Sequence, residues 1–401
     1  MKHILFLTST NLACNPRCRK EVELALDEGY KVSVVAFEMD NWTKDKERQI
    51  IEVLKDVTFY HLPAGRSSYW NWLKSVLIEN ACRWLYKFGI RTTWVIGMAV
   101  SRRSILINGL LRKINISPDL IIAHNPGAFY PAAKFAKNRQ SAFGIDVEDY
   151  HPGEGSDPFI RQVNEQLLKK VLPKAAYVSY ASEPIMHRVF ALGTKNKTSP
   201  QFVVNNTFAA SDFGVPAENK DIQYLHFIWF SQNIDVTRGL EQVLPILDSF
   251  QDKVRLTLIG NLNKSFFDQY LINRKYVTII SSLTQEDLHR RLVQYDIGLA
   301  IEPGKDENNN LALSNKIWAY FQAGLYILAT GTEAQSSFIE KFSDHGVISS
   351  LEETDLKRTI SSLLDKRDII LANKLARWKY AQRNSWSVES NKLLKSWKQT
   401  N

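Results

Sequence analysis

The sequence predicts an α/β protein of two domains, each built on a parallel sheet covered by helices. Its 401 residues exceed one ordinary hydrophobic core and suit two domains of about 150 to 200 residues. Short apolar runs alternate with amphipathic helical stretches along most of the chain, which is the pattern of doubly wound sheets. A hydrophobic fraction of 44% and a charged fraction of 23% are typical of a folded globular chain.

Residues 1–206 are predicted to form the first domain. Gly29 closes the first helix, because glycine readily adopts the conformation that ends a helix. We expect strands at Ile4 to Thr8, Lys31 to Phe37, Val57 to His61, Leu120 to His124, Phe143 to Val147, Tyr177 to Ala181 and Phe202 to Val204. The intervening helices are expected at Cys18 to Glu28, Ala128 to Lys137, Pro158 to Val171 and Glu183 to Leu192.

Residues 207–221 break this periodicity with Ala, Ser, Gly, Pro and Asn and are predicted to be a linker. Residues 222–380 then repeat the alternation and form the second domain. Its strands are expected at Leu225 to Phe230, Arg255 to Ile259, Val277 to Ile280, Ile297 to Ile301 and Tyr326 to Ala329. Its helices are expected at Gly239 to Phe250, Gln285 to Gln294, Ser314 to Ala323 and Glu333 to Phe342.

The chain ends in an amphipathic helical region from about Asp368 to Lys398. We expect its last part, residues 381–401, to be a helix that crosses back onto the first domain. Ligands of open α/β sheets bind at the carboxyl ends of the strands. Two such domains therefore predict a cleft lined by the loops that follow the strands.

Residues 67–114 interrupt the first domain with a helical insert rich in tryptophan and in basic residues. Apolar residues recur there at helical spacing, as Trp70 and Trp84 illustrate, and cations such as Lys74 and Arg83 lie among them. The apolar run within the insert is too short to span a bilayer. We predict that these four residues contact anionic lipid of the inner leaflet. The alternative is that the apolar stripe packs on its own domain.

The net charge of +9 favours anionic partners. Nucleic acid is the least favoured of these, because the positive charge gathers in the insert and no base-reading motif is present. The apolar run after Met1 is too short for a signal peptide, and three cysteines fit a reducing compartment, so we expect a cytoplasmic protein. Cys14 and Cys18 lack the second ligand pair of a structural zinc site, and we expect no metal.

Several segments resemble glycosyltransferase family 4. Asn15-Pro16-Arg17, followed by a helix and Gly29-Tyr30-Lys31-Val32, resembles the Asp-Pro-Arg-Val opening of that family. The strand ending in His124-Asn125-Pro126 and the later Asp146-Val-Glu148-Asp149 are similar to its strand ending in His and its Asp-x-His-Glu, with Glu148 in place of the histidine. The most specific match is Ser314-Asn-Lys316-Ile-Trp-Ala-Tyr320-Phe-Gln-Ala-Gly324, which resembles Pro-x-Lys-[Leu/Ile]-x-Glu-Tyr-x-Ala-x-Gly.

The resemblance extends over nearly the whole chain and implies a GT-B fold, with two Rossmann-like domains facing a cleft. It implies a retaining, metal-independent glycosyltransferase of hexosyltransferase type. The donor would be a UDP- or GDP-sugar, and the acceptor a saccharide or a polyprenyl-diphosphate-linked saccharide. The implied process is the synthesis of a bacterial-type surface polysaccharide or glycan.

The donor-binding candidates lie in the second domain. The diphosphate of a sugar nucleotide gains charge as the glycosyl bond breaks, and a helix N-terminus with a nearby cation stabilises that charge. Arg238 precedes the helix that starts at Gly239, where the family carries Lys/Arg-Gly, and Lys316 lies in the first turn of the next candidate helix. The other donor-binding candidates are Ser314 and Asn315 at that helix start, Glu302 after a strand, and Gln232 near the place of a family arginine.

The acceptor and catalytic candidates lie in the first domain. His124 ends a strand, and Asp146 and Glu148 end the next, where they are suited to act as a base or to bind sugar hydroxyls. Asp149 follows directly, and we expect only one or two of these three carboxylates to face the cleft, because side chains alternate along a strand. The alternatives are a hydrogen-bonded framework histidine and helix-capping carboxylates. Asn15, Arg17 and Asn125 follow strands and are the acceptor-binding candidates.

The chain departs from the family at the Glu-x7-Glu pair that usually contacts the donor. The corresponding positions carry Leu311 and Ala319. Two alternatives to a transferase therefore stay open. One is a non-catalytic GT-B scaffold or regulatory subunit, and the other is a sugar-nucleotide epimerase of the same architecture.

Overall fold

The computed structural model describes residues 1–39, 41, 43–195, 199–216 and 223–400. The chain divides into two compact units. The first contains Met1–Asn205, Asp306–Asn308 and Ser390–Asn401, and the second contains Asn206–Lys305 and Asn309–Glu389. Residues 217–222, which include the end of the predicted linker and the start of the predicted second domain, lie outside the described residues.

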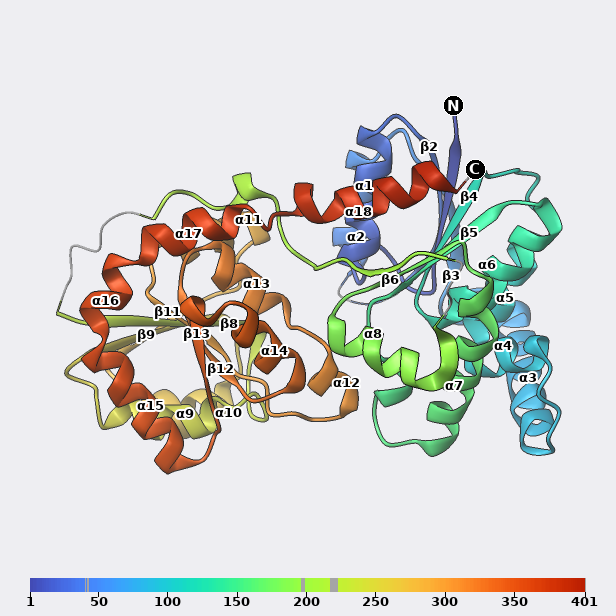
Figure 1. Cartoon of the computed structure of the whole chain (residues 1–401). Helices are drawn as coiled ribbons and strands as arrows, with labels where there is room; N and C mark the ends of the chain where they lie inside the picture. Colours follow the sequence, from blue (N-terminus) through green and yellow to red (C-terminus); the bar gives the residue numbers. More distant parts are fainter. Residues whose placement is uncertain (40, 42, 196–198, 217–222, 401) are drawn as a thin grey trace. The chain divides into compact units, whose positions relative to one another are not determined.

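Within the described residues, the first unit is built on a parallel seven-stranded sheet of order β3-β2-β1-β4-β5-β6-β7 (Figure 1). The order reverses between β1 and β4, which is the topological switch point. The predicted strands are present with boundaries shifted by one or two residues. They are β1 (His3–Thr8), β2 (Lys31–Glu38), β3 (Thr58–Pro63), β4 (Leu120–His124), β5 (Ala142–Val147), β6 (Tyr177–Tyr180) and β7 (Gln201–Val203).

The helices of the first unit include the predicted insert, which forms three helices between β3 and β4. The α-helices of the first unit that precede the linker are α1 (Pro16–Asp27), α2 (Lys44–Val53), α3 (Tyr69–Lys87), α4 (Thr93–Val100), α5 (Arg102–Leu111), α6 (Pro126–Arg139), α7 (Pro158–Val171) and α8 (Glu183–Val189). Helices α1 and α6 pack on strands of the sheet, whereas α3 packs on α4 and α5.

The second unit has, within the described residues, a parallel six-stranded sheet of order β10-β9-β8-β11-β12-β13, with its switch point between β8 and β11. Its strands are β8 (Leu225–Ile234), β9 (Val254–Leu262), β10 (Val277–Ile280), β11 (Ile297–Ala300), β12 (Tyr326–Thr330) and β13 (Gly346–Ser349). Its helices are α9 (Leu240–Asp248), α10 (Lys264–Phe266), α11 (Gln285–Leu292), α12 (Glu307–Leu311), α13 (Asn315–Gln322), α14 (Glu333–Lys341), α15 (Glu353–Asp365), α16 (Arg367–Ala372) and α17 (Lys374–Gln382). α12 begins within the short segment that belongs to the first unit.

Helix α18 (Trp386–Gln399) joins the two units, since its residues from Ser390 onward belong to the first. Trp397 is buried there and its indole N–H donates to the Tyr177 hydroxyl at 2.9 Å. The described part of the predicted linker packs on the second unit, where the rings of Phe208 and Phe213 contact His289 with centroids 4.4 and 4.5 Å apart.

Five of the helices and strands given above were not predicted: α2, α10, α12, α15 and β13. α2 is almost entirely polar, so hydrophobic periodicity does not reveal it. β13 has only four residues at the sheet edge, and such short runs carry little signal. The C-terminal helical region is broken into α16, α17 and α18 rather than continuous. Among the described residues, none of the helices combines the length and apolarity that crossing a membrane requires.

Candidate functional site

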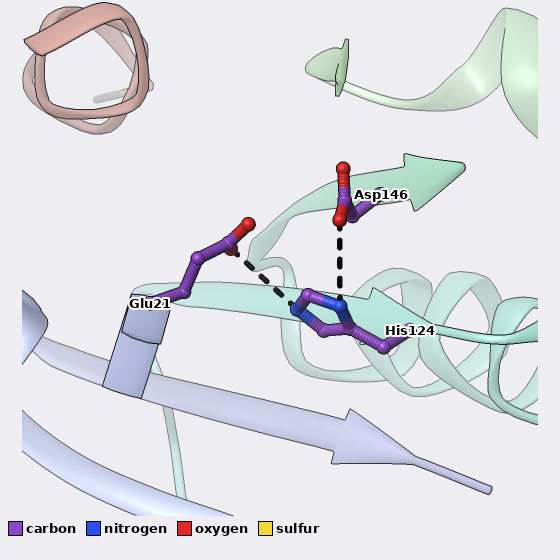
Figure 2. Close-up of side chains that lie close together, drawn as sticks. All are labelled: Glu21, His124 and Asp146. Atoms are coloured by element: carbon purple, nitrogen blue, oxygen red, sulfur yellow. Dashed lines mark ion pairs between the residues drawn. The ribbon is translucent and has the colours of Figure 1, made fainter. Parts of the chain in front are cut away.

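The candidate residues of the first unit lie at the carboxyl ends of β4 and β5, beside the switch point. The strand register pairs Thr8 with His124, His124 with Asp146, and Asp146 with Ser179. These residues therefore form one row across the sheet. Helix α1 covers the row with its buried face, which carries Arg17, Cys18 and Glu21. Figure 2 shows His124 between the carboxylates of Glu21 and Asp146.

His124 is completely buried and lies among carboxylates. Its Nδ1 is 2.6 Å from Glu148 Oε1, and its Nε2 is 3.5 Å from Glu21 Oε2. Burial alone would lower the pKa of His124, but the neighbouring Cys18 and the carboxylates of Glu21 and Glu148 outweigh it and raise the pKa well above the ordinary value. The imidazole thus holds a proton against Glu148. The predicted position of His124 at a strand end is correct, but the side chain itself has no exposed surface.

Asp146 forms a buried ion pair with Arg17, and both are candidate site residues. The guanidinium contacts both carboxylate oxygens of Asp146, with Nη2 to Oδ1 at 2.8 Å, and also donates to the Val204 carbonyl. Ser179 donates to the same Asp146 oxygen at 2.6 Å. Both side chains are fully buried and their polar atoms are engaged within the protein. In this structure Asp146 is therefore not placed to act as an acceptor base, and Arg17 is not placed to bind an acceptor.

Glu21 was not predicted as a site residue, although the structure places it beside His124. Its side chain is fully buried, and neither carboxylate oxygen has a hydrogen-bond partner within the described residues. Burial raises the pKa of Glu21, although His124 and Arg17 act in the opposite direction. The sequence signal is the spacing: Glu21 lies four residues after Arg17, and so on the same helix face.

Glu21, His124 and Asp146 each offer a ligand atom within 4.8 Å of the others, an arrangement that resembles a metal site. The donor set does not fit a metal, however. Both oxygens of Asp146 already accept from Arg17, one of them also from Ser179, and the adjacent guanidinium would repel a cation. We therefore assign no step to a metal at this point.

Glu148 is the member of this network whose side chain reaches the surface, with 14% of it exposed. It accepts a hydrogen bond from Asn15 Nδ2 at 2.7 Å in addition to its contact with His124. Burial would raise the pKa of Glu148, but the bonds to His124 and Asn15 and the charge of Arg17 lower it below its usual range. Glu148 is thus a carboxylate held in a fixed orientation at the edge of the sheet.

Asn15 and Asn125 begin the two helices that flank the switch point. Asn15 caps α1 by accepting from the Cys18 N–H at 2.8 Å. Asn125 begins α6 with φ +66° and ψ 150°, a conformation that non-glycine residues rarely adopt. Its side chain accepts from the Thr8 hydroxyl at 2.9 Å. Such strain is characteristic of functional loops, and Asn125 immediately follows His124.

A cavity of about 490 Å³ lies at the carboxyl ends of β2 and β3, in the first unit. Apolar groups such as Phe37 and Ile51 line it together with the charged Lys44, Arg48 and Glu52. None of these residues was predicted to belong to a site, because four of them lie on α2, a helix that was not predicted.

In the second unit, Lys316 and Glu302 lie together at the carboxyl edge of the sheet. Lys316 Nζ donates to Glu302 Oε1 at 2.8 Å and lies 5.8 Å from the centre of the Trp229 ring. The Thr330 hydroxyl fixes the backbone of Glu302 by accepting from its N–H at 2.9 Å and donating to its carbonyl at 2.8 Å. The two side chains are 13% and 22% exposed, so both reach solvent.

The remaining donor-binding candidates lie in the same unit. Ser314 caps α13 by accepting from the Lys316 N–H, and Asn315 accepts from Asn206 at 2.8 Å. Arg238 is exposed in the turn before α9, between Thr237 at φ +66° and Gly239 at φ +83°. Gln232 is exposed near the end of β8, beside an irregularity in its pairing with β9.

The two positions that depart from the family pattern are occupied by buried apolar side chains. Leu311 is 3% exposed, and Ala319 is completely buried in the core cluster that contains Tyr320 and Phe321. Carboxylates at these positions would have to be buried among apolar groups, which is costly without a partner. The packing at these two positions therefore suits apolar side chains such as Leu311 and Ala319.

No protein-family model matches the chain, and no curated protein sequence matches it. Solved structures do match. HepE of Anabaena in complex with UDP aligns with a TM-score of 0.68 at 14% identity over 100% of both chains. A putative UDP-N-acetylglucosamine 2-epimerase of Listeria monocytogenes gives 0.60 at 14% identity, over 98% and 95% of the chains. The lipopolysaccharide outer core galactosyltransferase WaaB gives 0.60 at 12% identity over 100% of both. The chain therefore has the GT-B fold of two Rossmann-like domains.

Proposed function

We propose that the protein is a glycosyltransferase that moves a sugar from a nucleotide-sugar donor to a saccharide acceptor. The observation that carries this proposal is the Lys316–Glu302 pair at the carboxyl edge of the second sheet, where open α/β sheets bind ligands. Lys316 supplies a cation in the first turn of α13, and Glu302 supplies a carboxylate for sugar hydroxyls. Structural neighbours support this choice, because HepE binds UDP and WaaB is a galactosyltransferase.

The role that we propose for each residue follows from whether its side chain reaches solvent. Lys316, assisted by Arg238 in the turn before α9, holds the diphosphate and stabilises the charge that it gains as the glycosyl bond breaks. Glu148 orients the sugar or takes the proton of the acceptor hydroxyl, with His124 and Asn15 holding it in place. We propose retention of configuration and no metal, and a role in surface glycan synthesis, as the sequence resemblance implies.

The acceptor is proposed to bind in the cavity at the ends of β2 and β3. Its lining combines an aromatic surface at Phe37 with charged and polar groups at Lys44, Arg48 and Glu52, a mixture suited to stacking and hydrogen bonding with a saccharide. Asn125 lies at the end of β4, on the other side of β1 from β2. A saccharide on a polyprenyl diphosphate is the acceptor that we favour, since it would be presented at the membrane surface.

Replacing Lys316 by alanine is expected to weaken UDP binding and to lower kcat/KM by about tenfold to a hundredfold. One hydrogen bond to a charged group is worth about 1.5 to 3 kcal/mol, and its loss has effects of this size. Isothermal titration with UDP and GDP, followed by turnover with the preferred sugar nucleotide, measures both quantities.

The matched control is Lys275→Ala, which removes an exposed lysine just before β10, at the opposite edge of the same sheet. It is expected to bind the nucleotide like the parent protein. Equal affinities of the parent and the Lys316→Ala variant would remove Lys316 from the site. A parent protein that binds no nucleoside diphosphate would instead favour the scaffold alternative.

The epimerase alternative is kept because a putative UDP-N-acetylglucosamine 2-epimerase has the same fold. The two reactions differ in their need for an acceptor. An epimerase converts its sugar nucleotide when no acceptor is added, whereas a transferase releases the nucleoside diphosphate as it glycosylates an acceptor. Analysis of the products with and without a saccharide acceptor separates the two functions.

We further propose that α3 docks the enzyme on an anionic membrane surface. Trp70, Leu77, Trp84 and Phe88 recur along one face of this helix and are 78, 61, 60 and 67% exposed. This exposure argues against the alternative in which the stripe packs on its own domain. Lys74 is exposed on the same helix and complements anionic lipid. The guanidinium of Arg83 donates to the Ala99 carbonyl and to Glu79, and so also links α3 to the rest of the insert.

Changing both Trp70 and Trp84 to alanine is expected to reduce binding to phosphatidylglycerol vesicles by about tenfold or more, because each indole contributes a large apolar area at the interface. Co-sedimentation at low salt measures the bound fraction. The control replaces Ile272 and Ile369 by alanine, two isoleucines of the second unit that are 61 and 65% exposed. A parent protein that stays in the supernatant, or a stripe that instead mediates self-association in analytical ultracentrifugation, would contradict the proposal.

A further inference from the structure

A basic hollow lies between α5 and α6 of the first unit, away from the carboxyl edge that carries the candidate site. It has a volume of about 260 Å³ and is lined by Arg112, Lys134 and Arg139 together with the amides of Asn108 and Asn138. Its lining contains no carboxylate among the described residues. Arg139 is partly engaged, since it donates to the Ile114 carbonyl at 3.1 Å and its guanidinium carbon lies 5.4 Å from the centre of the Phe135 ring.

The cations of this hollow repel one another. Burial lowers the pKa of Lys134, and the charge of Arg112 lowers it further. A second hollow of about 790 Å³ shares Lys134 and Asn138 with the first, and adds Lys137, Lys170 and Lys174, again with no lining carboxylate in the described chain. Such a concentration of one sign of charge attracts anions, and the combination of guanidinium, ammonium and amide donors suits a phosphate group.

An apolar cavity adjoins the basic hollow on its other side. It has a volume of about 290 Å³ and shares Asn108 and Arg112 with the hollow. Its walls are largely apolar and include Ile78 of α3, Met98 of α4 and Leu106 of α5, while Lys74 and Lys113 also line it. A ligand that fills both spaces must therefore be amphiphilic, with a phosphate at one end and a hydrocarbon chain beside it.

We propose that the hollow and the cavity together bind one anionic phospholipid. Its phosphate contacts Arg112 and Lys134, and one acyl chain enters between Ile78, Met98 and Leu106. A free phosphorylated metabolite shares the phosphate chemistry but leaves the apolar cavity unfilled. The site is independent of the glycosyl transfer proposed above, because its residues lie outside the candidate donor and acceptor residues. It also differs from the exposed stripe of α3, since it recognises a single lipid molecule.

The test uses the full chain and dihexanoyl phosphatidylglycerol below its micelle concentration, with isothermal titration as the readout. Two further probes separate the sources of affinity. Dihexanoyl phosphatidylcholine has the same chains without the net charge, and glycerol 3-phosphate has the phosphate without the chains. The phosphatidylglycerol is expected to bind about tenfold or more tightly than either, because only it satisfies both parts of the site.

Two variants remove the two parts separately. Arg112→Gln combined with Lys134→Gln removes the cations, and Gly109→Leu fills the apolar cavity, where an added Cβ meets no atom within 4 Å. Each is expected to weaken binding of the phosphatidylglycerol by about tenfold. Gly109→Leu lies within α5, where leucine is a better helix former than glycine, so the fold is expected to persist in thermal melting. The control, Lys46→Gln on the exposed surface of α2, is expected to bind like the parent.

Three results would overturn the proposal. The first is no binding of the phosphatidylglycerol by the parent protein. The second is equal binding by the parent and by both variants. The third is glycerol 3-phosphate binding as tightly as the phosphatidylglycerol, which would assign the hollow to a free phosphate compound.

Discussion

Replacing Glu148 by glutamine is expected to lower kcat/KM by about 10² to 10⁴, the range for loss of a positioned acid or base, while the fold is retained. Glu148 is the network carboxylate that reaches solvent, and its bonds to Asn15 and His124 keep it ionised. Glutamine has nearly the same shape but can neither accept a proton nor stabilise the imidazolium of His124. Steady-state turnover, with UDP affinity measured in parallel, separates this effect from donor binding.

The matched control for this variant is Glu23→Gln, which makes the same chemical change on α1. Glu23 forms a partly exposed pair with Arg19 at 2.7 Å, an interaction that contributes little to stability. Turnover of the Glu23→Gln variant is expected to equal that of the parent. A Glu148→Gln variant within about threefold of the parent would exclude Glu148 from the chemistry of the reaction, since general acid–base catalysis contributes far more than this.

The pH dependence of the parent protein offers a second observation on the same group. The pKa of Glu148 is lowered, so its carboxylate persists as the pH falls through the usual range for glutamate. The contribution of Glu148 to the free energy of unfolding is present above the pKa that this group has in the unfolded chain. It is lost as the pH falls through the pKa that the group has in the folded protein. His124 acts in the opposite sense: its pKa is raised, so its contribution is lost as the pH rises through the folded value.

The fold was predictable because most of its elements carry a strong periodic pattern. The strand Leu120 to His124 has the predicted bounds, since its five buried residues are followed directly by Asn125 and by Pro126, which begins α6. The pattern fails where burial is weak or the element is short, as in α2 and β13. Pairing between strands explains why His124 and Asp146 come together, because parallel strands end at the same edge of a sheet.

The contacts of the site were less predictable than its location. Asp146 and Arg17 are 129 residues apart, and nothing local indicates that each satisfies the other. Carboxylates of Glu148 and Asp146 both lie near His124, and the side chain of Glu148 reaches the surface while that of Asp146 does not. The sequence could not indicate this difference, because it depends on how α1 covers the sheet. Lys316 and Glu302, in contrast, were both predicted as donor-binding, and the structure brings them to 2.8 Å.

Replacing Arg17 by methionine is expected to destabilise the first unit by about 3 to 5 kcal/mol, because it leaves the Asp146 carboxylate buried without its cation. Hydrogen exchange of the β4 and β5 amides is the appropriate measurement, because the chain has two compact units and exchange reports the stability of the first one locally. Arg19→Met, on the same helix, removes only a surface pair and is expected to cost less than about 1 kcal/mol.

The double variant Arg17→Met with Asp146→Asn distinguishes the loss of a charge partner from the loss of packing. If the unpaired carboxylate is the cause, neutralising it recovers a large part of the stability that Arg17→Met removes. The amide oxygen introduced by Asp146→Asn would still accept from Ser179, whose hydroxyl lies 2.6 Å from the aspartate oxygen in the parent. Equal exchange rates in the parent and the Arg17→Met variant would show that the ion pair does not hold α1 on the sheet. Glu148, which Asn15 of α1 orients, would then owe its position to His124 alone.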